Sequence, residues 1–267
     1  MSIHPTAVID PKAELDSSVT VGPFAVIEAG VKIGAETKIE SHAIVSGPTT
    51  IGDNNLIGSF STIGSAPQDL SYDGEPTELI IGSHNKIREY SSINRGTVNG
   101  GGKTVIGDNN LLMAYTHVAH DCLIGNYVIL ANVATLAGHV EVGDHASIGG
   151  LVAVHQFCRI GKFSYIGGFS GITLDVPPYV ILGGTRNRTR IAGINKVGLR
   201  RNKFSRETIK KLDRAFKIIF RSPNLLMKDA IEVARKEITD CPEVEYLVKF
   251  FEDSKRGVVK QTLMSDL

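Results

Sequence analysis

The stretch Ile51-Gly52-Asp53-Asn54-Asn55-Leu56-Ile57-Gly58-Ser59-Phe60-Ser61-Thr62-Ile63 carries the pattern that decides the fold. Its isoleucines at 51, 57 and 63 stand six residues apart, with Gly, Asp, Asn and Ser between them. An α-helix repeats its apolar face about every 3.6 residues and a strand about every two, so a period of six fits neither element alone. A fixed short period predicts a solenoid, in which each repeat adds one step to a coil.

The same frame extends over most of the first 177 positions. The aliphatic positions on it are Ile3, Ile9, Leu15, Val21, Ile27, Ile33, Ile39 and Val45 before the quoted stretch, then Ile81, Ile87 and Ile93, and, after a slip of one residue, every sixth residue from Ile106 to Ile172. If each hexad forms one short strand and one corner, three hexads complete a turn and the aliphatic side chains stack inside. Each buried aliphatic contributes roughly 1.5–3 kcal/mol. The sequence therefore predicts a mainly β fold, a parallel β-helix of hexapeptide repeats.

The repeat ends at Asp175-Val176-Pro177-Pro178-Tyr179, because two prolines interrupt a hydrogen-bonded ladder. Beyond Arg190 the apolar period becomes helical, with Ser205 as an N-cap candidate and Pro242 as a first helical residue. The predicted helices are residues 206–221, residues 225–238 and a third from Pro242. We expect two domains, a β-helix over residues 1–190 and a C-terminal helical domain over residues 191–267.

Composition excludes several classes of protein. The chain has 267 residues and a net charge of +1, so no global field favours nucleic acid. Its N-terminus lacks the features of a signal peptide, no apolar run could span a bilayer, and its three cysteines show no metal-ligand spacing. We therefore expect a cytoplasmic protein without an integral membrane segment.

Basic residues are concentrated near the start of the predicted helical domain. They are Arg200, Arg201, Lys203, Arg206, Lys210, Lys211, Arg214 and Lys217, with only Glu207 and Asp213 among them. Two interpretations remain open: a solvated helix face, or a docking patch for phosphates or for an acidic carrier protein.

Two stretches interrupt the hexads, residues 66–76 and residues 97–103. Loops that leave a rigid solenoid are frequent places for functional residues. The triple glycine at 100–102 is interpreted as a flexible surface loop, and no Gly-Lys-Ser/Thr sequence follows it to make a nucleotide-phosphate loop.

Histidines are the main candidates for chemistry, since the core of a repeat has no packing need for them. The middle repeats contain His117, His120, His139, His145 and His155. Val118 takes the inward slot, so His120 and Asp121 are expected outward at a corner. A neutral imidazole oriented by a carboxylate is a general base suited to neutral pH. His145 is interpreted as a surface or corner-capping residue, and a zinc cluster is disfavoured because no cysteine joins the histidines at ligand spacing.

Several motifs stand out from the hexads. They are residues 117–122 (His-Val-Ala-His-Asp-Cys), 136–140 (Leu-Ala-Gly-His-Val), 153–158 (Ala-Val-His-Gln-Phe-Cys), 175–179, 68–70, 74–77, 95–97 (Arg-Gly-Thr) and 204–207. These motifs resemble those of the UDP-N-acetylglucosamine acyltransferases, which catalyse the first step of lipid A synthesis in Gram-negative bacteria. The resemblance runs nearly end to end, and its histidine motifs are more specific than the hexads. It implies a left-handed coil and a homotrimer with active sites between subunits.

The resemblance also implies the reaction and its residues. A 3-hydroxyacyl chain passes from acyl carrier protein, which carries it as a phosphopantetheine thioester, to the 3-position of the glucosamine in UDP-GlcNAc, without a further cofactor or metal. His120 corresponds to the general base, Asp121 to the carboxylate that orients it and Gly138 to the oxyanion donor. Gly168 corresponds to the acyl-chain ruler. The positions that match substrate contacts are Gln68, Asp69, His117, His139, His155 and Gln156, together with Asn195 and Arg201 on the nucleotide side.

Three departures from the family pattern leave the acceptor open. Asn94 stands where many members have His, Ser71 where many have Lys, and one of two tandem arginines is displaced in Arg200-Arg201-Asn202-Lys203. The alternatives are the same transfer to the 3-amino analogue, which gives an amide, and a trimeric hexapeptide-repeat scaffold without catalysis. The later N-acyltransferase of the pathway shares the coil but carries an added N-terminal domain, for which hexads that begin at Ile3 leave no room.

Overall fold

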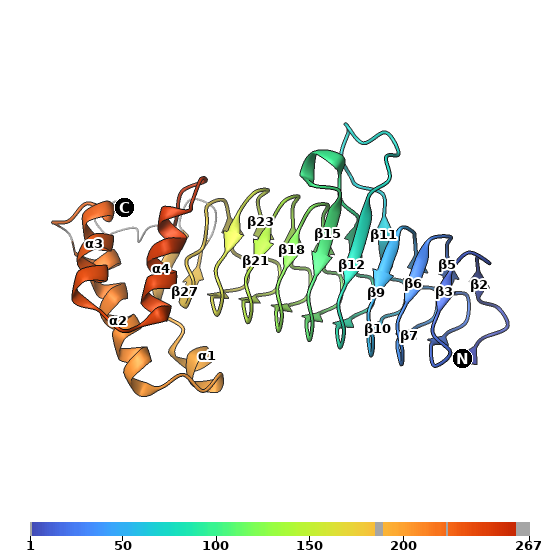
Figure 1. The fold of residues 1–267 in the computed structure, drawn as a ribbon, viewed down its shortest axis with the longest axis horizontal. Helices are drawn as coiled ribbons and strands as arrows, with labels where there is room; N and C mark the ends of the chain where they lie inside the picture. Colours follow the sequence, from blue (N-terminus) through green and yellow to red (C-terminus); the bar gives the residue numbers. More distant parts are fainter. Residues whose placement is uncertain (1, 185–188, 223, 260–267) are drawn as a thin grey trace.

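The computed structural model describes residues 2–184, 189–222 and 224–259. Their architecture is a left-handed parallel β-helix with a group of helices across its C-terminal end (Figure 1). Each turn of the coil contributes one short strand to each of three sheets, and neighbouring strands of a sheet are parallel throughout the coil. The fold class predicted from the six-residue period is thereby confirmed.

The first sheet has eleven strands. They are β1 (Ser2–Ile3), β4 (Thr20–Val21), β7 (Lys38–Ile39), β10 (Leu56–Ile57), β13 (Lys86–Ile87), β16 (Leu111–Leu112), β19 (Ile129–Leu130), β22 (Ser147–Ile148), β25 (Tyr165–Ile166), β27 (Val180–Gly183) and β28 (Arg190–Ile194).

The second and third sheets have nine and eight strands. The second consists of β2 (Val8–Ile9), β5 (Val26–Ile27), β8 (Ile44–Val45), β11 (Thr62–Ser65), β14 (Ser92–Asn94), β17 (His117–Val118), β20 (Thr135–Leu136), β23 (Ala153–Val154) and β26 (Gly171–Ile172). The third consists of β3 (Glu14–Leu15), β6 (Val31–Ile33), β9 (Thr49–Ile51), β12 (Glu78–Ile81), β15 (Lys103–Ile106), β18 (Leu123–Ile124), β21 (Glu141–Val142) and β24 (Arg159–Ile160).

The register explains the sequence period. Val118 of β17 lies beside Leu136 of β20, one turn and three hexads along, and the frame aliphatics from Val21 onward are almost completely buried. The small residues between them, such as Ala134 and Ser164, share this interior. Both interruptions leave the coil as loops on the same side, beside β11 and β15 in Figure 1, and the ladder resumes after each. The hexads thus form the core and the interruptions form its projections.

The coil extends beyond the two prolines. β27 pairs in parallel with β25, and β28 then pairs antiparallel with β27. The expected boundary after residue 190 therefore falls inside β28, after its first residue. The chain also returns to the coil after the helices, since Asp175 forms a β-bridge with Val258.

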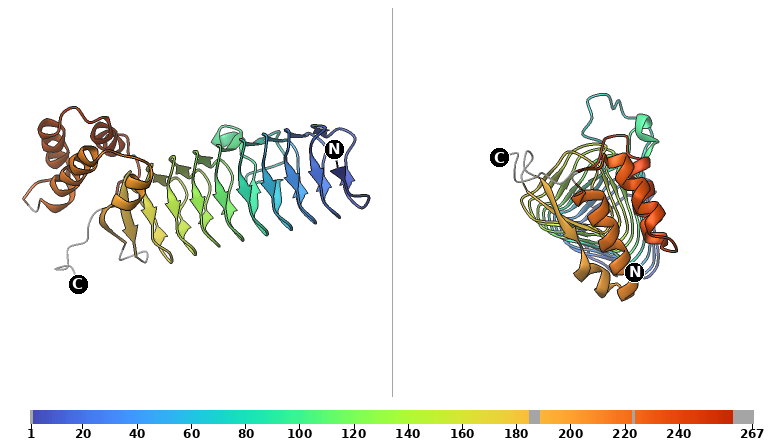
Figure 2. Two further views of the ribbon diagram at one scale, coloured as in Figure 1. Left: turned by 90° about the horizontal axis from the view of Figure 1, so that it is seen from below. Right: turned by 90° about the vertical axis from the view of Figure 1, so that its left-hand side faces the viewer.

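The helical part contains α1 (Lys196–Arg201), α2 (Arg206–Arg221), α3 (Met227–Glu237) and α4 (Pro242–Glu252). The sequence predicted the last three. Ser205 caps α2 through a hydrogen bond from Thr208 N, and Pro242 opens α4. The short α1 was missed. Figure 2 shows these helices standing across the open end of the coil, where they cover the last strands. None of the described helices is long and apolar enough to cross a membrane.

Candidate active site

The candidate site lies at the corner of the coil between β17 and β18 and at its equivalents in the next turns. Asp121, His139 and Phe157 occupy this corner 18 residues apart, each with φ between 60° and 63°. Asp and His are among the residues that tolerate this left-handed conformation best. His139 N donates to His120 O and Phe157 N to Gly138 O, so the turns stack in a fixed register.

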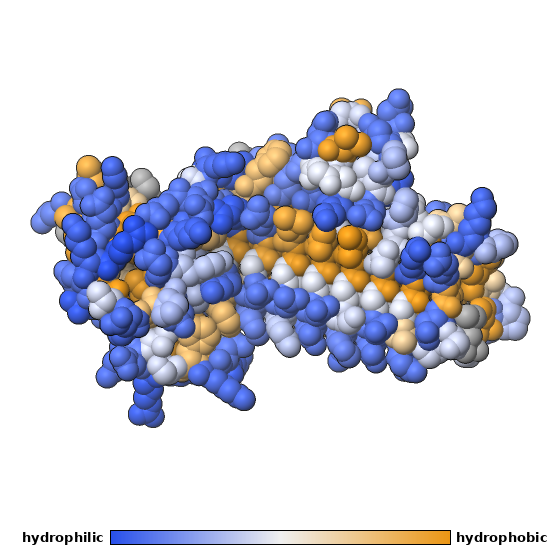
Figure 3. Space-filling view, viewed as in Figure 1, coloured by the Kyte–Doolittle hydropathy of each residue, from blue (hydrophilic) through white to orange (hydrophobic). Residues whose placement is uncertain are grey.

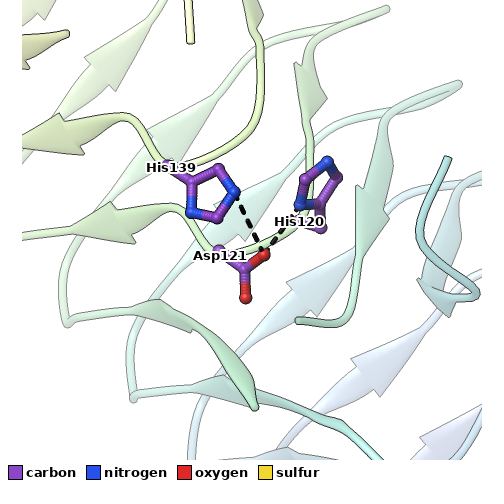
Figure 4. A group of neighbouring side chains, drawn as sticks. All are labelled: His120, Asp121 and His139. Atoms are coloured by element: carbon purple, nitrogen blue, oxygen red, sulfur yellow. Dashed lines mark hydrogen bonds and ion pairs between the residues drawn. The ribbon is translucent and has the colours of Figure 1, made fainter. Parts of the chain in front are cut away.

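His120 and Asp121 form a hydrogen-bonded pair at this corner, with 2.7 Å between His120 Nδ1 and Asp121 Oδ2 (Figure 4). The His120 side chain is 12% exposed and that of Asp121 is 0% exposed. With Nδ1–H directed to the carboxylate, Nε2 carries the lone pair that can take a proton. The sequence placed both side chains outward, but the Asp121 carboxylate is buried, because residues of the 97–103 loop cover it.

Gly138 lies directly against the His120 ring. A Cβ at this position would come within 2.6 Å of His120 Cε1, so only glycine leaves room for the imidazole. Among the described residues, the Gly138 N–H has no hydrogen-bond acceptor. An N–H without an acceptor among the described residues, beside an imidazole that can take a proton, suits the stabilisation of a developing oxyanion.

Two further histidines flank the pair. His139 Nε2 lies 3.7 Å from Asp121 Oδ2, and the His139 ring meets the His120 ring edge-on and stacks on Phe157. His117 Nδ1 is 2.7 Å from Ser92 Oγ. Burial lowers the pKa of His139 and of His117, and a charge on His120 would lower both further. Both imidazoles are therefore neutral hydrogen-bonding groups at neutral pH.

The loop at residues 66–76 brings Asp69 toward the histidines. The Ser71 N–H and hydroxyl both donate to Asp69 Oδ1 at 2.8 Å, and these bonds lower the pKa of Asp69, as do the positive charges that His120 and His139 would carry. Asn94 Nδ2 donates to Ala66 O at the base of the loop. Two of the departures from the family pattern, Ser71 and Asn94, thus orient Asp69 and anchor its loop. Gln68 is exposed on the same loop.

His155 and Gln156 lie one turn further along and are exposed. Arg256, from the segment after α4, reaches His155, with 2.8 Å between Arg256 Nη2 and His155 Nδ1. A cleft of about 750 Å³ opens beside this corner, and Asp121, His139, Phe157 and Arg256 are among the residues that line it.

Other predicted site residues lie elsewhere. Asn195 caps α1 by accepting from Gly198 N and donates to Phe163 O, and Arg201 is exposed at the end of α1. Gly168 is exposed at a different corner. Within the described part of the chain, no hydrogen bond or ion pair connects these three to His120 or Asp121. His145 stacks between Tyr127 and Phe163 at the remaining corner, as a corner-capping residue does.

The cluster could also be considered as a metal site, since His120, Asp121 and His139 offer ligand atoms within 4.8 Å of one another. The donor set fits poorly, because Asp121 Oδ2 already accepts from His120 and from Thr97. The arrangement is better suited to proton transfer. Sequence reasoning gave no role to Thr97, although it lies in one of the motifs, and it missed Ser92 and Arg256. The partners of all three are distant in the chain.

Comparisons with known proteins find relatives along nearly the whole chain. Residues 175–259 match the family described as Udp N-acetylglucosamine O-acyltransferase, domain 2, and residues 30–65 and 103–138 match bacterial transferase hexapeptide repeats. An acyl-[acyl-carrier-protein]–UDP-N-acetylglucosamine O-acyltransferase of Trichlorobacter lovleyi is 55% identical, over 97% of this chain and 100% of that protein. That of Thermodesulfovibrio yellowstonii is 53% identical, over 97% and 99%.

Solved structures give the same result. LpxA from Acinetobacter baumannii is 47% identical with a TM-score of 0.93, over 97% of this chain and 99% of that one. The UDP-N-acetylglucosamine acyltransferase of Francisella novicida is 37% identical with a TM-score of 0.94, over 99% and 96%.

Proposed function

The chain belongs to the family of acyl-[acyl-carrier-protein]–UDP-N-acetylglucosamine O-acyltransferases, and from this membership and the site we infer its reaction. We propose that it transfers a 3-hydroxyacyl chain from acyl carrier protein to the 3-hydroxyl of the glucosamine in UDP-GlcNAc, the first step of lipid A synthesis. The observation that carries the proposal is the pair of His120 with the buried Asp121 carboxylate, beside a Gly138 N–H that has no acceptor among the described residues.

The chemistry follows from these groups. His120 Nε2 takes the proton of the acceptor hydroxyl as the oxygen attacks the thioester carbonyl. Asp121 stabilises the imidazolium that forms, and the Gly138 N–H donates to the oxyanion of the tetrahedral intermediate. When the C–S bond breaks, the imidazolium returns the proton to the departing thiolate. The products are an ester and a free pantetheine thiol, so the reaction needs no further cofactor.

The test is an assay of the purified chain with UDP-GlcNAc and 3-hydroxyacyl carrier protein, with product identified by mass. The 3-amino analogue is offered in parallel, since Ser71 and Asn94 replace two residues that are common at the acceptor site. We expect faster ester formation, in agreement with the names of the relatives. Faster amide formation would assign the amine acceptor instead, and no transfer to either would favour the non-catalytic scaffold.

We propose further that the chain acts as a homotrimer and that Asn195 and Arg201 reach the nucleotide bound at a neighbouring copy. Apolar side chains remain uncovered on the coil. Figure 3 shows such a band over β12, β15 and β18, where Ile80, Val105 and Leu123 lie side by side. Light scattering should give three times the mass of the chain. A monomer that turns over substrate would contradict the shared site.

The donor protein is proposed to dock on the basic stretch at the start of the helical part. Several of its charges are paired within the chain, as in the contacts of Lys211 with Glu207 and of Lys217 with Asp213. Arg200, Arg201 and Lys203 are exposed, and charges of this kind attract an acidic carrier. The three cysteines are buried and unpaired, which suits the reducing cytoplasm, where we place the reaction.

Gly168 is proposed as the acyl-chain ruler. It is exposed, and the site of its missing Cβ lies 3.1 Å from Gly150 O, so a side chain there would have to extend outward over the surface beside Phe169. A groove that passes glycine stays open to a long chain, around fourteen carbons by family resemblance. Gly168→Met should shift preference toward shorter donors in a competition between chain lengths, and an unchanged profile would place the ruler elsewhere.

A further inference from the structure

Thr97 lies outside the hexads, on the 97–103 loop, and both of its donors go to one carboxylate. Its N–H donates to Asp121 Oδ1 at 2.8 Å and its hydroxyl to Asp121 Oδ2 at 2.7 Å. Thr97 is 4% exposed, and the Asp121 carboxylate is 0% exposed. A buried carboxylate is costly unless its oxygens are hydrogen-bonded. Among the described residues, Thr97 provides two of the three hydrogen bonds that the side chain of Asp121 receives, and His120 provides the third.

The direction of the Thr97 hydroxyl is fixed by the loop itself. Gly100 N donates to Thr97 Oγ1 at 3.1 Å, so this oxygen acts as an acceptor on that side and its own hydrogen points to Asp121. Thr97 is the N-cap of the short 3-10 turn η1 (Val98–Gly100), whose closure brings Gly100 over the carboxylate. The turn and the carboxylate therefore hold each other in place.

The triple glycine has two separate roles in this arrangement. A Cβ on Gly100 would overlap the carboxylate of Asp121, so only glycine fits there. Gly101 and Gly102 have φ of 94° and 82° and open space around them, so they are needed for the shape of the turn alone. The interpretation of this stretch as a flexible surface loop is wrong for Gly100, which packs on the site.

We propose that Thr97 is a positioning residue of the acyl transfer and that Gly100 gives the space it needs. Thr97 holds the Asp121 carboxylate in the one orientation that presents Oδ2 to His120 Nδ1, and the turn keeps water away from that bond. It touches neither substrate nor reacting atoms, and it acts through Asp121. The inference rests on the proposed function and adds a third member to the His120–Asp121 pair.

The first test compares Thr97→Val with Thr97→Ser. Valine has the shape of threonine without the hydroxyl, and it leaves His120 as the sole donor to Asp121 Oδ2 among the described residues. We expect kcat to fall about 10- to 100-fold, the range for loss of a hydrogen bond to a buried charge, with KM for UDP-GlcNAc within about twofold. Serine keeps the hydroxyl and should retain kcat within about threefold. Equal losses in the two variants would overturn the proposal.

A double-mutant cycle separates positioning from general support of the fold. If Thr97 acts through Asp121, Thr97→Val should cost less than about threefold in the Asp121→Asn background, because the orientation it secures is already lost. Full additivity would overturn the proposal. Val98→Ala is the matched control from the same turn, since Val98 is exposed, and it should leave kcat unchanged.

Gly100→Ala keeps the test decisive if Thr97→Val fails to fold. The added methyl overlaps the carboxylate while every group of Thr97 stays in place, so kcat should fall at unchanged KM. Wild-type turnover from Gly100→Ala would overturn the inference. His120→Ala, assayed alongside, separates this inference from the proposed function. If His120→Ala and the Thr97 and Gly100 variants all retain full activity, the proposed function fails. If His120→Ala is inactive while the Thr97 and Gly100 variants are fully active, only the role of Thr97 fails.

Discussion

Two corners of the coil are built alike and differ in what they can do. One carries Asp121, His139 and Phe157, and the other carries Tyr127, His145 and Phe163, in each case 18 residues apart. His139 and His145 have nearly the same φ, 60° and 58°, and burial lowers the pKa of both. Each stacks on the phenylalanine of the following turn.

The difference lies on the preceding turn. His145 meets a second flat ring there, Tyr127, with centroids 4.7 Å apart. His139 instead meets Asp121 and the edge of His120, and the 97–103 loop covers the carboxylate. A histidine at a corner is thus a packing element by default. At the proposed active site, a carboxylate replaces the aromatic ring and an inserted loop shields that carboxylate from water.

The strongest test of this contrast removes one histidine from each corner. His120→Ala takes away the proposed base, and a positioned general base contributes roughly 10²–10⁴-fold, so kcat should fall by at least about 10²-fold with a modest change in KM. His145→Ala should leave kcat nearly unchanged. Steady-state kinetics on both variants measure this. If His120→Ala kept more than about a tenth of wild-type turnover, the base would have to be another residue, with His117 and His139 the next candidates.

The second test substitutes the residue that lies one turn before each histidine at its corner, Asp121 before His139 and Tyr127 before His145. Asp121→Asn keeps the shape but removes the charge that stabilises the imidazolium, so kcat should fall by about 10- to 10³-fold, less than for His120→Ala. Tyr127→Phe keeps the other stack and should have wild-type kcat. A loss in Tyr127→Phe as large as in Asp121→Asn would mean that both corners serve the reaction only by supporting the fold.

Gly138→Ala is the third test, because it disturbs the reactive corner without removing any chemical group. The added Cβ would push the His120 ring off its place, and we expect kcat to fall about tenfold or more, since small misplacements of a catalytic group are costly. Gly193→Ala in β28 is the control, as nothing lies within 4 Å of the Cβ added there. An active Gly138→Ala enzyme would show that the position of His120 is less restricted than the contact implies.

The sequence predicted which residues lie together at the corner of His120, but not the contacts that the 97–103 loop and the segment after α4 make there. The hexads place His120, Gly138 and Asp121 by register, because each aliphatic position fixes its neighbours in the coil. Thr97 is different: it contacts Asp121 across 24 residues through a loop that has no period. Arg256 reaches His155 across 101 residues. Such contacts depend on where a loop or a returning segment lies in space, and no local pattern carries that information.

The smallest expected effect is on the pH dependence of Tm, measured in variants of the histidine at each corner. Because burial lowers the folded-state pKa of His145, the unfolded chain takes up a proton below about pH 6.5 that the folded chain still excludes. The contribution of neutral His145 to the free energy of unfolding is complete above about pH 6.5. It is lost as the pH falls from there through the pKa of His145 in the folded chain. His145→Phe keeps the stack without the titration, so Tm should fall less between pH 7.5 and 5.5 than in wild type, by on the order of 1 °C because the ring is partly exposed.

His139→Phe is the matched variant at the reactive corner. Burial also lowers the pKa of His139, so this substitution should flatten the dependence of Tm on pH in the same direction. It should also reduce turnover, because the phenylalanine brings an apolar edge where His139 faces Asp121, whereas His145→Phe should be fully active. Equal activity of the two variants would show that the corners differ only in His120 and Asp121, and that His139 has the packing role of His145.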